Sequence, residues 1–139
     1  MSDVALMKFE FIVDGPPVSQ QTRRRKRLID WKILVRQEAE KYWTDEQKML
    51  TGLVMLQVTY FFDNVEMDVD NIVKPIQDAI IQLAYADDKQ ICDVLVRKRS
   101  LFGKFQAKGL TPVLEEGFAR GNDFLYVVVT AAPDQEVLT

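Results

Sequence analysis

Residues 53–62 are the part of this chain that most restricts its possible folds. The segment reads LVMLQVTYFF and carries apolar side chains at both alternating sets of positions. Valine, threonine, tyrosine and phenylalanine favour β-structure, and a strand that is apolar on both faces is buried on both faces. We therefore predict that this segment is the central strand of a sheet.

Apolar periodicity places the other elements around this strand. We expect further strands at 6–13, 91–99 and 124–131, and helices at 28–43 and 71–84. Polar loops are expected over 14–27 and 101–123, the second with some local structure. The order strand, helix, strand, helix, strand, strand predicts an α+β fold, a single small domain over residues 1–139 with a mixed β-sheet and two main helices.

Composition narrows the possible chemistry. The 139 residues include no histidine and a single cysteine, Cys92. Ser-His and Cys-His catalysis, histidine zinc sites and intrachain disulfides are therefore excluded. Catalysis must come from carboxylates, lysine, hydroxyls or an oxygen-bound metal. Because no apolar run reaches the roughly 20 residues of a membrane span and the N-terminus lacks a signal-peptide pattern, we expect a cytoplasmic protein with no membrane partner.

Four aspartates flank the second predicted helix. Asp68 and Asp70 precede it, while Asp87 and Asp88 follow it. If the chain turns back after the helix, three carboxylates meet, and two such charges about 4 Å apart repel by about 4 kcal/mol at an effective dielectric of 20. A divalent cation reverses that sign, and oxygen ligands suit Mg²⁺. The alternative is purely structural, with Asp70 or Asn71 as an N-cap and the later pair as a turn.

Lys74 lies in the first turn of this helix, on the same face as Asn71 and Asp78. An exposed bridge from Lys74 to Asp78 would stabilise the helix by only about 0.3 kcal/mol. The functional alternative is that Lys74 points toward the aspartates, where it would stabilise negative charge on a phosphate. Pro75 must lie in or near the first turn, because deeper in a helix it removes a hydrogen bond.

The stretch DVDNIVKPIQDAIIQ, followed by ADDKQI, resembles the signature of the RusA family of Holliday junction resolvases. The upstream segment GPPVSQQ at residues 15–21 resembles the Gly-Pro-Pro segment of that family, although Gln20, Gln21 and Thr22 stand where the family often has Lys-Gln-Arg. The signature positions matched are Asp68, Asp70, Asn71, Lys74, Asp78, Ala79, Asp87, Asp88, Gln90 and Ile91.

The resemblance implies a Mg²⁺-dependent endonuclease, with Mn²⁺ as a possible substitute, that acts as a homodimer on four-way junction DNA. It implies that Asp68, Asp70 and Asp88 are the catalytic, metal-binding carboxylates and that Lys74 is the functional lysine. Asp87, Asn71 and Asp78 also match, but capping and packing account for them. The expected reaction is resolution of Holliday junctions by paired nicks in recombination and repair. The alternatives are a non-cleaving nucleic-acid-binding module and a nuclease for other branched DNA such as flaps.

Basic residues are concentrated in two places although the net charge is −3. Arg97 and Arg99 share one face of a predicted strand, with Lys98 on the other. The other place is residues 23–27, here called the basic run. It is either a solvated charge cluster or, beside a site that cuts phosphodiesters, a contact with the DNA backbone. Together with Lys74, its members are the predicted DNA-binding residues: Arg23, Arg24, Arg25, Lys26 and Arg27.

Overall fold

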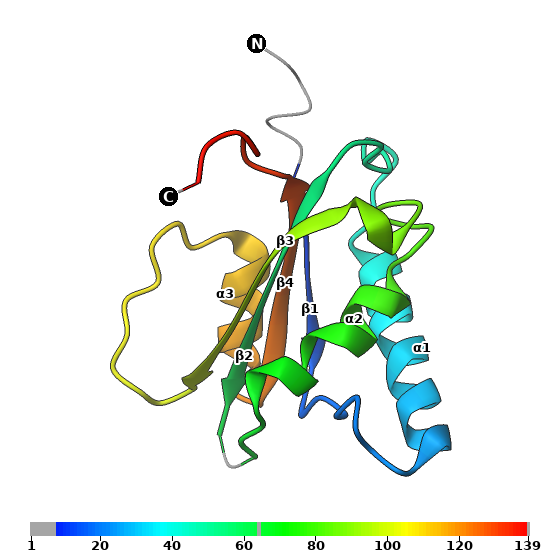
Figure 1. The fold of residues 1–139 in the computed structure, drawn as a ribbon. Coiled ribbons are helices and arrows are strands. Elements are labelled where there is room, and N and C mark those ends of the chain that lie inside the picture. Colours follow the sequence, from blue (N-terminus) through cyan, green and yellow to red (C-terminus); the bar gives the residue numbers. More distant parts are fainter. Residues whose placement is uncertain (1–7, 64, 139) are drawn as a thin grey trace.

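A computed structural model describes residues 8–63 and 65–138 (Figure 1). Four strands form one sheet in the order β1-β4-β2-β3. The first two residues of the strand predicted at 6–13 lie outside the described residues. The strands and helices are β1 Lys8–Asp14, α1 Arg25–Lys41, β2 Val54–Phe62, α2 Val73–Ala79, β3 Ile91–Ser100, α3 Pro112–Arg120 and β4 Phe124–Ala131.

The sheet is mixed, as predicted, and β2 occupies an inner position. β2 pairs antiparallel with β4 and parallel with β3. A parallel pair needs a crossover connection, and here two short 3₁₀ turns, η2 (Val69–Asn71) and η3 (Asp88–Gln90), flank α2 in that crossover. The signature segment is therefore the connection between two neighbouring parallel strands.

The two faces of the sheet are covered by different helices. Figure 1 shows α1 and α2 on one side and α3 on the other. Alternate side chains of β2, such as Val58 and Tyr60, belong to the larger core under α1 and α2. Phe61 belongs to a smaller core on the other side, with Leu114 of α3 and Phe124 of β4.

Two helices differ from expectation. The segment 101–123, predicted as a loop with local structure, contains α3. The helix predicted at 71–84 ends at Ala79, because the Arg36 guanidinium of α1 donates to the carbonyl oxygens of Ala79 at 3.4 Å and Ile81 at 2.6 Å. Gln82 then adopts a left-handed backbone with φ of 66°, which stops a right-handed helix.

The described part of the chain contains no helix long and apolar enough to cross a membrane.

Candidate active site

Asp68 and Asp70 lie at the start of the crossover, after β2. Asp68 has extended backbone angles and precedes η2, while Asp70 lies inside it. Both residues are exposed. The predicted capping role of Asp70 or Asn71 is wrong, because α2 has Ile72 at its N-cap position and no side chain caps either η2 or α2. The carboxylates of Asp68 and Asp70 are therefore not needed to cap the start of a helix.

Lys74, in the first turn of α2, lies between the carboxylates of Asp78 and Asp88. Its Nζ atom is 2.7 Å from Asp78 Oδ1 and 3.9 Å from Asp88 Oδ2. The i, i+4 bridge predicted from the sequence is thus present. The second distance shows that the chain turns back after α2 and brings Asp88 of η3 alongside its first turn. Pro75 also lies in this turn, as predicted.

Asp78 and Tyr85 make further contacts that hold α2 in place. Asp78 Oδ2 lies 3.6 Å from Lys32 Nζ, which joins α2 to α1. Tyr85 is fully buried and its hydroxyl donates to the Gln77 carbonyl at 2.7 Å. Burial, together with the nearby charges of Asp78 and Asp88, raises the pKa of Tyr85. The Tyr85 hydroxyl therefore stays protonated at neutral pH and serves as a hydrogen-bond donor to Gln77.

Asp87 and Gln90 have structural roles that confirm the expectation of capping for Asp87. The two residues form a capping box around η3: Asp87 Oδ1 accepts from the Lys89 N–H at 2.9 Å, and Gln90 Oε1 accepts from the Asp87 N–H at 3.1 Å. The Lys89 N–H bond is the main cause that lowers the pKa of Asp87. Gln90 Nε2 also donates to the Leu50 and Gly52 carbonyls, which fixes η3 beside the segment before β2.

The Gly-Pro-Pro segment lies against η2. The Gln20 N–H donates to the Asn71 carbonyl at 3.1 Å. A cavity of about 280 Å³ separates this segment from the residues before Asp68, and Arg27 and Met67 are among the residues that line it. Arg27, the last residue of the basic run, thus shares this cavity with Met67, the residue before Asp68.

The basic run is only partly in the loop predicted for it. Arg23 and Arg24 precede α1, but residues 25–27 form its first turn, and all five side chains are exposed. The first turn contains no acidic residue, so these cations face the positive end of the helix dipole, which is unfavourable. Lys26 pairs with Asp30 at 3.0 Å. A helix terminus built for stability alone would not carry this charge pattern.

The expected gathering of three carboxylates is not seen. Across residues 8–63 and 65–138, no group of three or more aspartate, glutamate or cysteine side chains is arranged to hold a metal ion. Separation lowers the mutual repulsion of such carboxylates. The donor set nevertheless fits a hard cation, because Asp68, Asp70 and Asp88 offer only oxygen atoms and Asp68 and Asp70 are exposed.

Arg97 and Arg99 lie away from these aspartates. Both line a cavity on the α3 side of the sheet, whereas Lys98 points to the other face, where its Nζ atom is 2.7 Å from Glu66 Oε1. The predicted division of these three cations between two faces is confirmed.

Comparison with protein families identifies this segment. A family model described as Endodeoxyribonuclease RusA matches residues 15–105, which include the Gly-Pro-Pro segment, the basic run, Lys74 and all four aspartates of the crossover. No curated protein matches the chain. Because the family model covers more than half of the sequence, the chain belongs to the RusA endodeoxyribonuclease family.

Proposed function

We propose that this endodeoxyribonuclease resolves Holliday junctions by paired nicks and requires Mg²⁺, which Mn²⁺ can replace. The observation that carries the proposal is the position of Lys74. This lysine lies 3.9 Å from Asp88 on the returning chain and one turn after the exposed Asp70. The lysine suited to phosphate thus lies beside Asp88 and close in sequence to Asp70, two of the three carboxylates proposed to bind the cation.

In this proposal Asp68, Asp70 and Asp88 hold the metal. The bound cation supplies Lewis-acid stabilisation of phosphate charge and a hydrolytic nucleophile at neutral pH. Lys74 stabilises the negative charge that develops on the scissile phosphate. Asp78 accepts from Lys74 at 2.7 Å, so it holds the ammonium group in position until a phosphate competes for it.

The basic run guides DNA to this site. Its side chains are exposed, Arg27 shares a cavity with Met67 beside Asp68, and three of the five residues lie at the end of α1 where the helix dipole already favours anions. Phosphate contacts made by Arg23, Arg24, Arg25, Lys26 and Arg27 would offset the repulsion between DNA and the aspartates.

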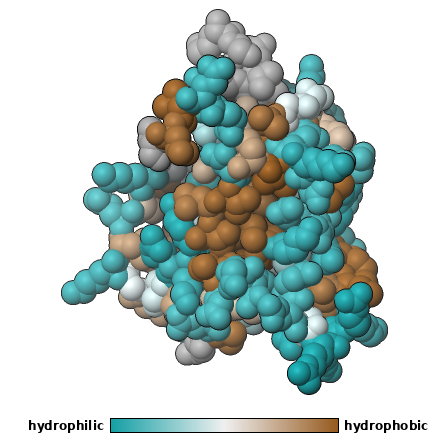
Figure 2. All heavy atoms as spheres, viewed as in Figure 1, coloured by the Kyte–Doolittle hydropathy of each residue, from teal (hydrophilic) through white to brown (hydrophobic). Residues whose placement is uncertain are grey.

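A homodimer accounts for paired nicks, since a four-way junction has approximate two-fold symmetry and one site cuts one strand. The exposed apolar side chains support contact between copies. Val94 and Leu95 of the edge strand β3 are 46% and 38% exposed, and Ile29 and Ile33 of α1 are 56% and 50% exposed. On the face viewed in Figure 1, Figure 2 shows hydrophobic surface in the middle, bordered by hydrophilic side chains.

The test is strand cleavage of a synthetic four-way junction, compared with a flap and a linear duplex of the same sequence. We expect symmetric nicks in the junction with Mg²⁺ or Mn²⁺ and none in excess chelator. Preferential cleavage of the flap would favour the other branched substrate. Full activity in chelator would refute the metal requirement, and a monomer in sedimentation that still makes paired nicks would refute the dimer.

A further inference from the structure

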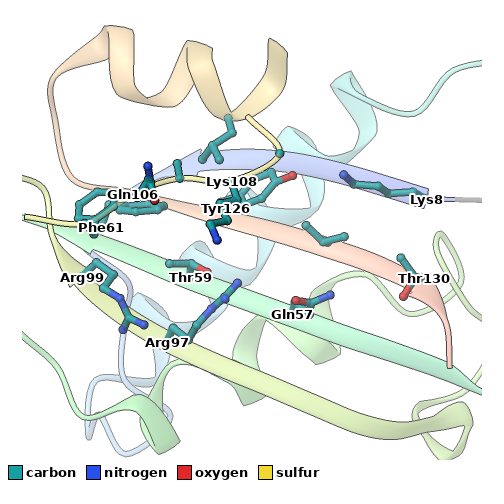
Figure 3. A pocket seen from close by; sticks show the side chains of 15 residues that line it. Lys8, Gln57, Thr59, Phe61, Arg97, Arg99, Gln106, Lys108, Tyr126 and Thr130 are labelled. Atoms are coloured by element: carbon teal, nitrogen blue, oxygen red, sulfur yellow. The ribbon is translucent and has the colours of Figure 1, made fainter. Parts of the chain in front are cut away.

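A cavity of about 400 Å³ lies on the α3 side of the sheet, away from the aspartates. Its floor is formed by alternate residues of the strands, such as Thr59 of β2 and Arg97 of β3, which are direct neighbours in the parallel pair. The segment between β3 and α3 forms its opposite wall, with Phe105 and Lys108. Figure 3 shows Thr59 and Arg97 on the strands and Lys108 on the segment that passes over them.

The charge of this cavity is one-sided. Lys8, Arg97, Arg99 and Lys108 line it, and no acidic residue does so among the described residues. Glu10 lies nearby but is already engaged. It pairs with Lys8 at 3.2 Å and accepts hydrogen bonds from the hydroxyls of Tyr126 and Thr111. The cavity therefore retains a net positive charge from the guanidinium groups and Lys108.

Arg97 is the residue that most requires a ligand. Its Nε atom is buried and has no hydrogen-bond partner among the described residues. Leaving a buried donor unpaired costs about 1–3 kcal/mol, and more when the group is charged. Arg99 differs, because its guanidinium donates to the Lys98 carbonyl at 2.9 Å. An anion in the cavity would satisfy the Arg97 donor and neutralise its neighbours.

Phosphate matches this site better than a simple carboxylate. A guanidinium donates two parallel hydrogen bonds to phosphate oxygens, and the remaining oxygens of the tetrahedral anion can take further cations. The cavity also has an aromatic wall, since Phe61 and Phe105 line it with ring centroids 5.6 Å apart. Phe105 is 37% exposed, so a base can stack on it while the phosphate contacts Arg97.

We propose that this cavity binds the phosphate group of a nucleotide, either a unit of bound DNA or a free nucleotide. Its position on the opposite side of the sheet from Asp68, Asp70 and Asp88 makes it a site separate from the proposed cleavage centre. The proposal does not depend on which carboxylates hold the metal.

The experiment follows the side-chain Nε–H signal of Arg97 by nuclear magnetic resonance in the presence of chelator. Three probes are added in turn: thymidine, thymidine 5′-monophosphate and a four-way DNA junction. We expect no change with thymidine and a clear shift with at least one phosphate-bearing probe. A shift with the monophosphate identifies a free nucleotide as a ligand, and a shift with the junction alone identifies the DNA backbone.

Variants test the same point by affinity. Arg97→Gln and, on the exposed loop, Lys108→Gln should each weaken binding of the phosphate probe, Arg97→Gln by about tenfold or more, as expected for loss of a charge-assisted hydrogen bond. Lys41→Gln removes an exposed cation at the end of α1 and should leave binding unchanged. No shift with either phosphate probe, or an equal shift with thymidine, would overturn the proposal. Because chelator prevents metal-dependent cleavage, a failure of junction cleavage would not alter these results.

Discussion

The two faces of the sheet differ in apolar burial and in the charge they carry. The face under α1 and α2 buries the larger core, including the fully buried Tyr60 and Tyr85, and the aspartates lie on its crossover. The α3 face buries a small cluster around Phe61 and Phe124 and leaves the rest of its surface to a cationic cavity. The face with most of the stabilising contacts thus also positions the carboxylates, while the less filled face has room for a ligand.

This difference has a physical basis in strand alternation. On β3, Lys98 points to one face, and Arg97 and Arg99 point to the other. Successive side chains on an edge strand cannot share a face, so the basic residues of this strand cannot all serve one site. The comparison predicts that substitutions on one face leave the function of the other intact.

Asp70→Asn should have the largest effect. The amide is a neutral, weaker ligand for a hard cation, so junction nicking should fall by orders of magnitude. Binding of the junction in chelator should hold or improve, because one charge that repels phosphate is removed. Folding should be unaffected, since Asp70 caps no helix. A gel shift and a nicking time course on the same junction measure both quantities.

Asp87→Asn is the matched control for this change. It alters an aspartate of the same crossover whose carboxylate caps η3. Nicking should stay near normal in this variant. Equal loss of nicking in both variants would show that the crossover responds to any change of charge and would remove the specific assignment of Asp70.

Lys74→Gln should follow, with a loss of nicking of about a hundredfold, as is typical when one preorganised donor to a transition state is removed. Asp78→Asn breaks the same 2.7 Å ion pair from its other end. If Lys74 served only that pair, the two variants would lose activity equally. We expect Asp78→Asn to retain most of the activity, and single-turnover rates at saturating enzyme decide between the two outcomes.

Replacement of Arg23, Arg24, Arg25, Lys26 and Arg27 by glutamine should flatten the salt dependence of junction binding. The slope of log affinity against log salt falls by about 0.9 for each DNA phosphate that the protein no longer neutralises. Thermal stability should hold or rise slightly, because like charges leave the N-terminal turn of α1. An unchanged slope would mean that the run is only solvated.

The crossover shows how far the sequence alone can be interpreted. Apolar periodicity correctly predicts β2, and β4 at its exact bounds. The end of α2 was not predictable in this way, because the Arg36 guanidinium that binds the Ala79 and Ile81 carbonyls comes from α1, 43 and 45 residues away. Tertiary contacts of this kind override local helix preference.

Other features had a sequence signal that periodicity does not use. Thr111 and Pro112 begin α3 and Gly121 ends it with φ of 72°, which is the usual order of N-cap, first-turn proline and terminal glycine. Asp87 and Gln90 likewise have the spacing of a capping box. The cationic cavity had no such signal, because Lys8 and Arg97 lie on the two edge strands, β1 and β3, and line one cavity only once the whole sheet has formed.

Gly117→Ala should weaken the α3 face without changing the chemistry of the other. A Cβ atom at Gly117 would lie 2.3 Å from the ring of Phe124, which is fully buried. Overpacking outweighs the better helix propensity of alanine, so we expect a net loss of about 2 kcal/mol. Urea unfolding measures this loss, and nicking per folded molecule should be retained.

Gly52→Ala is the matched control, since an added Cβ there meets no atom within 4 Å. Its stability should stay the same or rise slightly. A similar loss in both variants would show that the effect is not specific to the packing of α3 against β4.

Tyr42→Phe should have the smallest effect, confined to alkaline pH, and it tests the connection between the two faces. Tyr42 caps the C-terminus of α1, and its hydroxyl donates to Glu116 of α3 at 3.1 Å.

Burial, and then the bond to Glu116, raises the pKa of Tyr42 from 10.0 to about 12. Its contribution to stability is therefore fully present below pH 10 and is lost as the pH rises toward 12, because the unfolded chain ionises first. The pKa values of the other three tyrosines are also raised by burial, so the informative quantity is the difference between the two proteins in urea unfolding at about pH 8.5 and about pH 11. The original protein should lose more stability between these pH values than the phenylalanine variant, and equal losses would show that the bond from α1 to α3 does not contribute to folding.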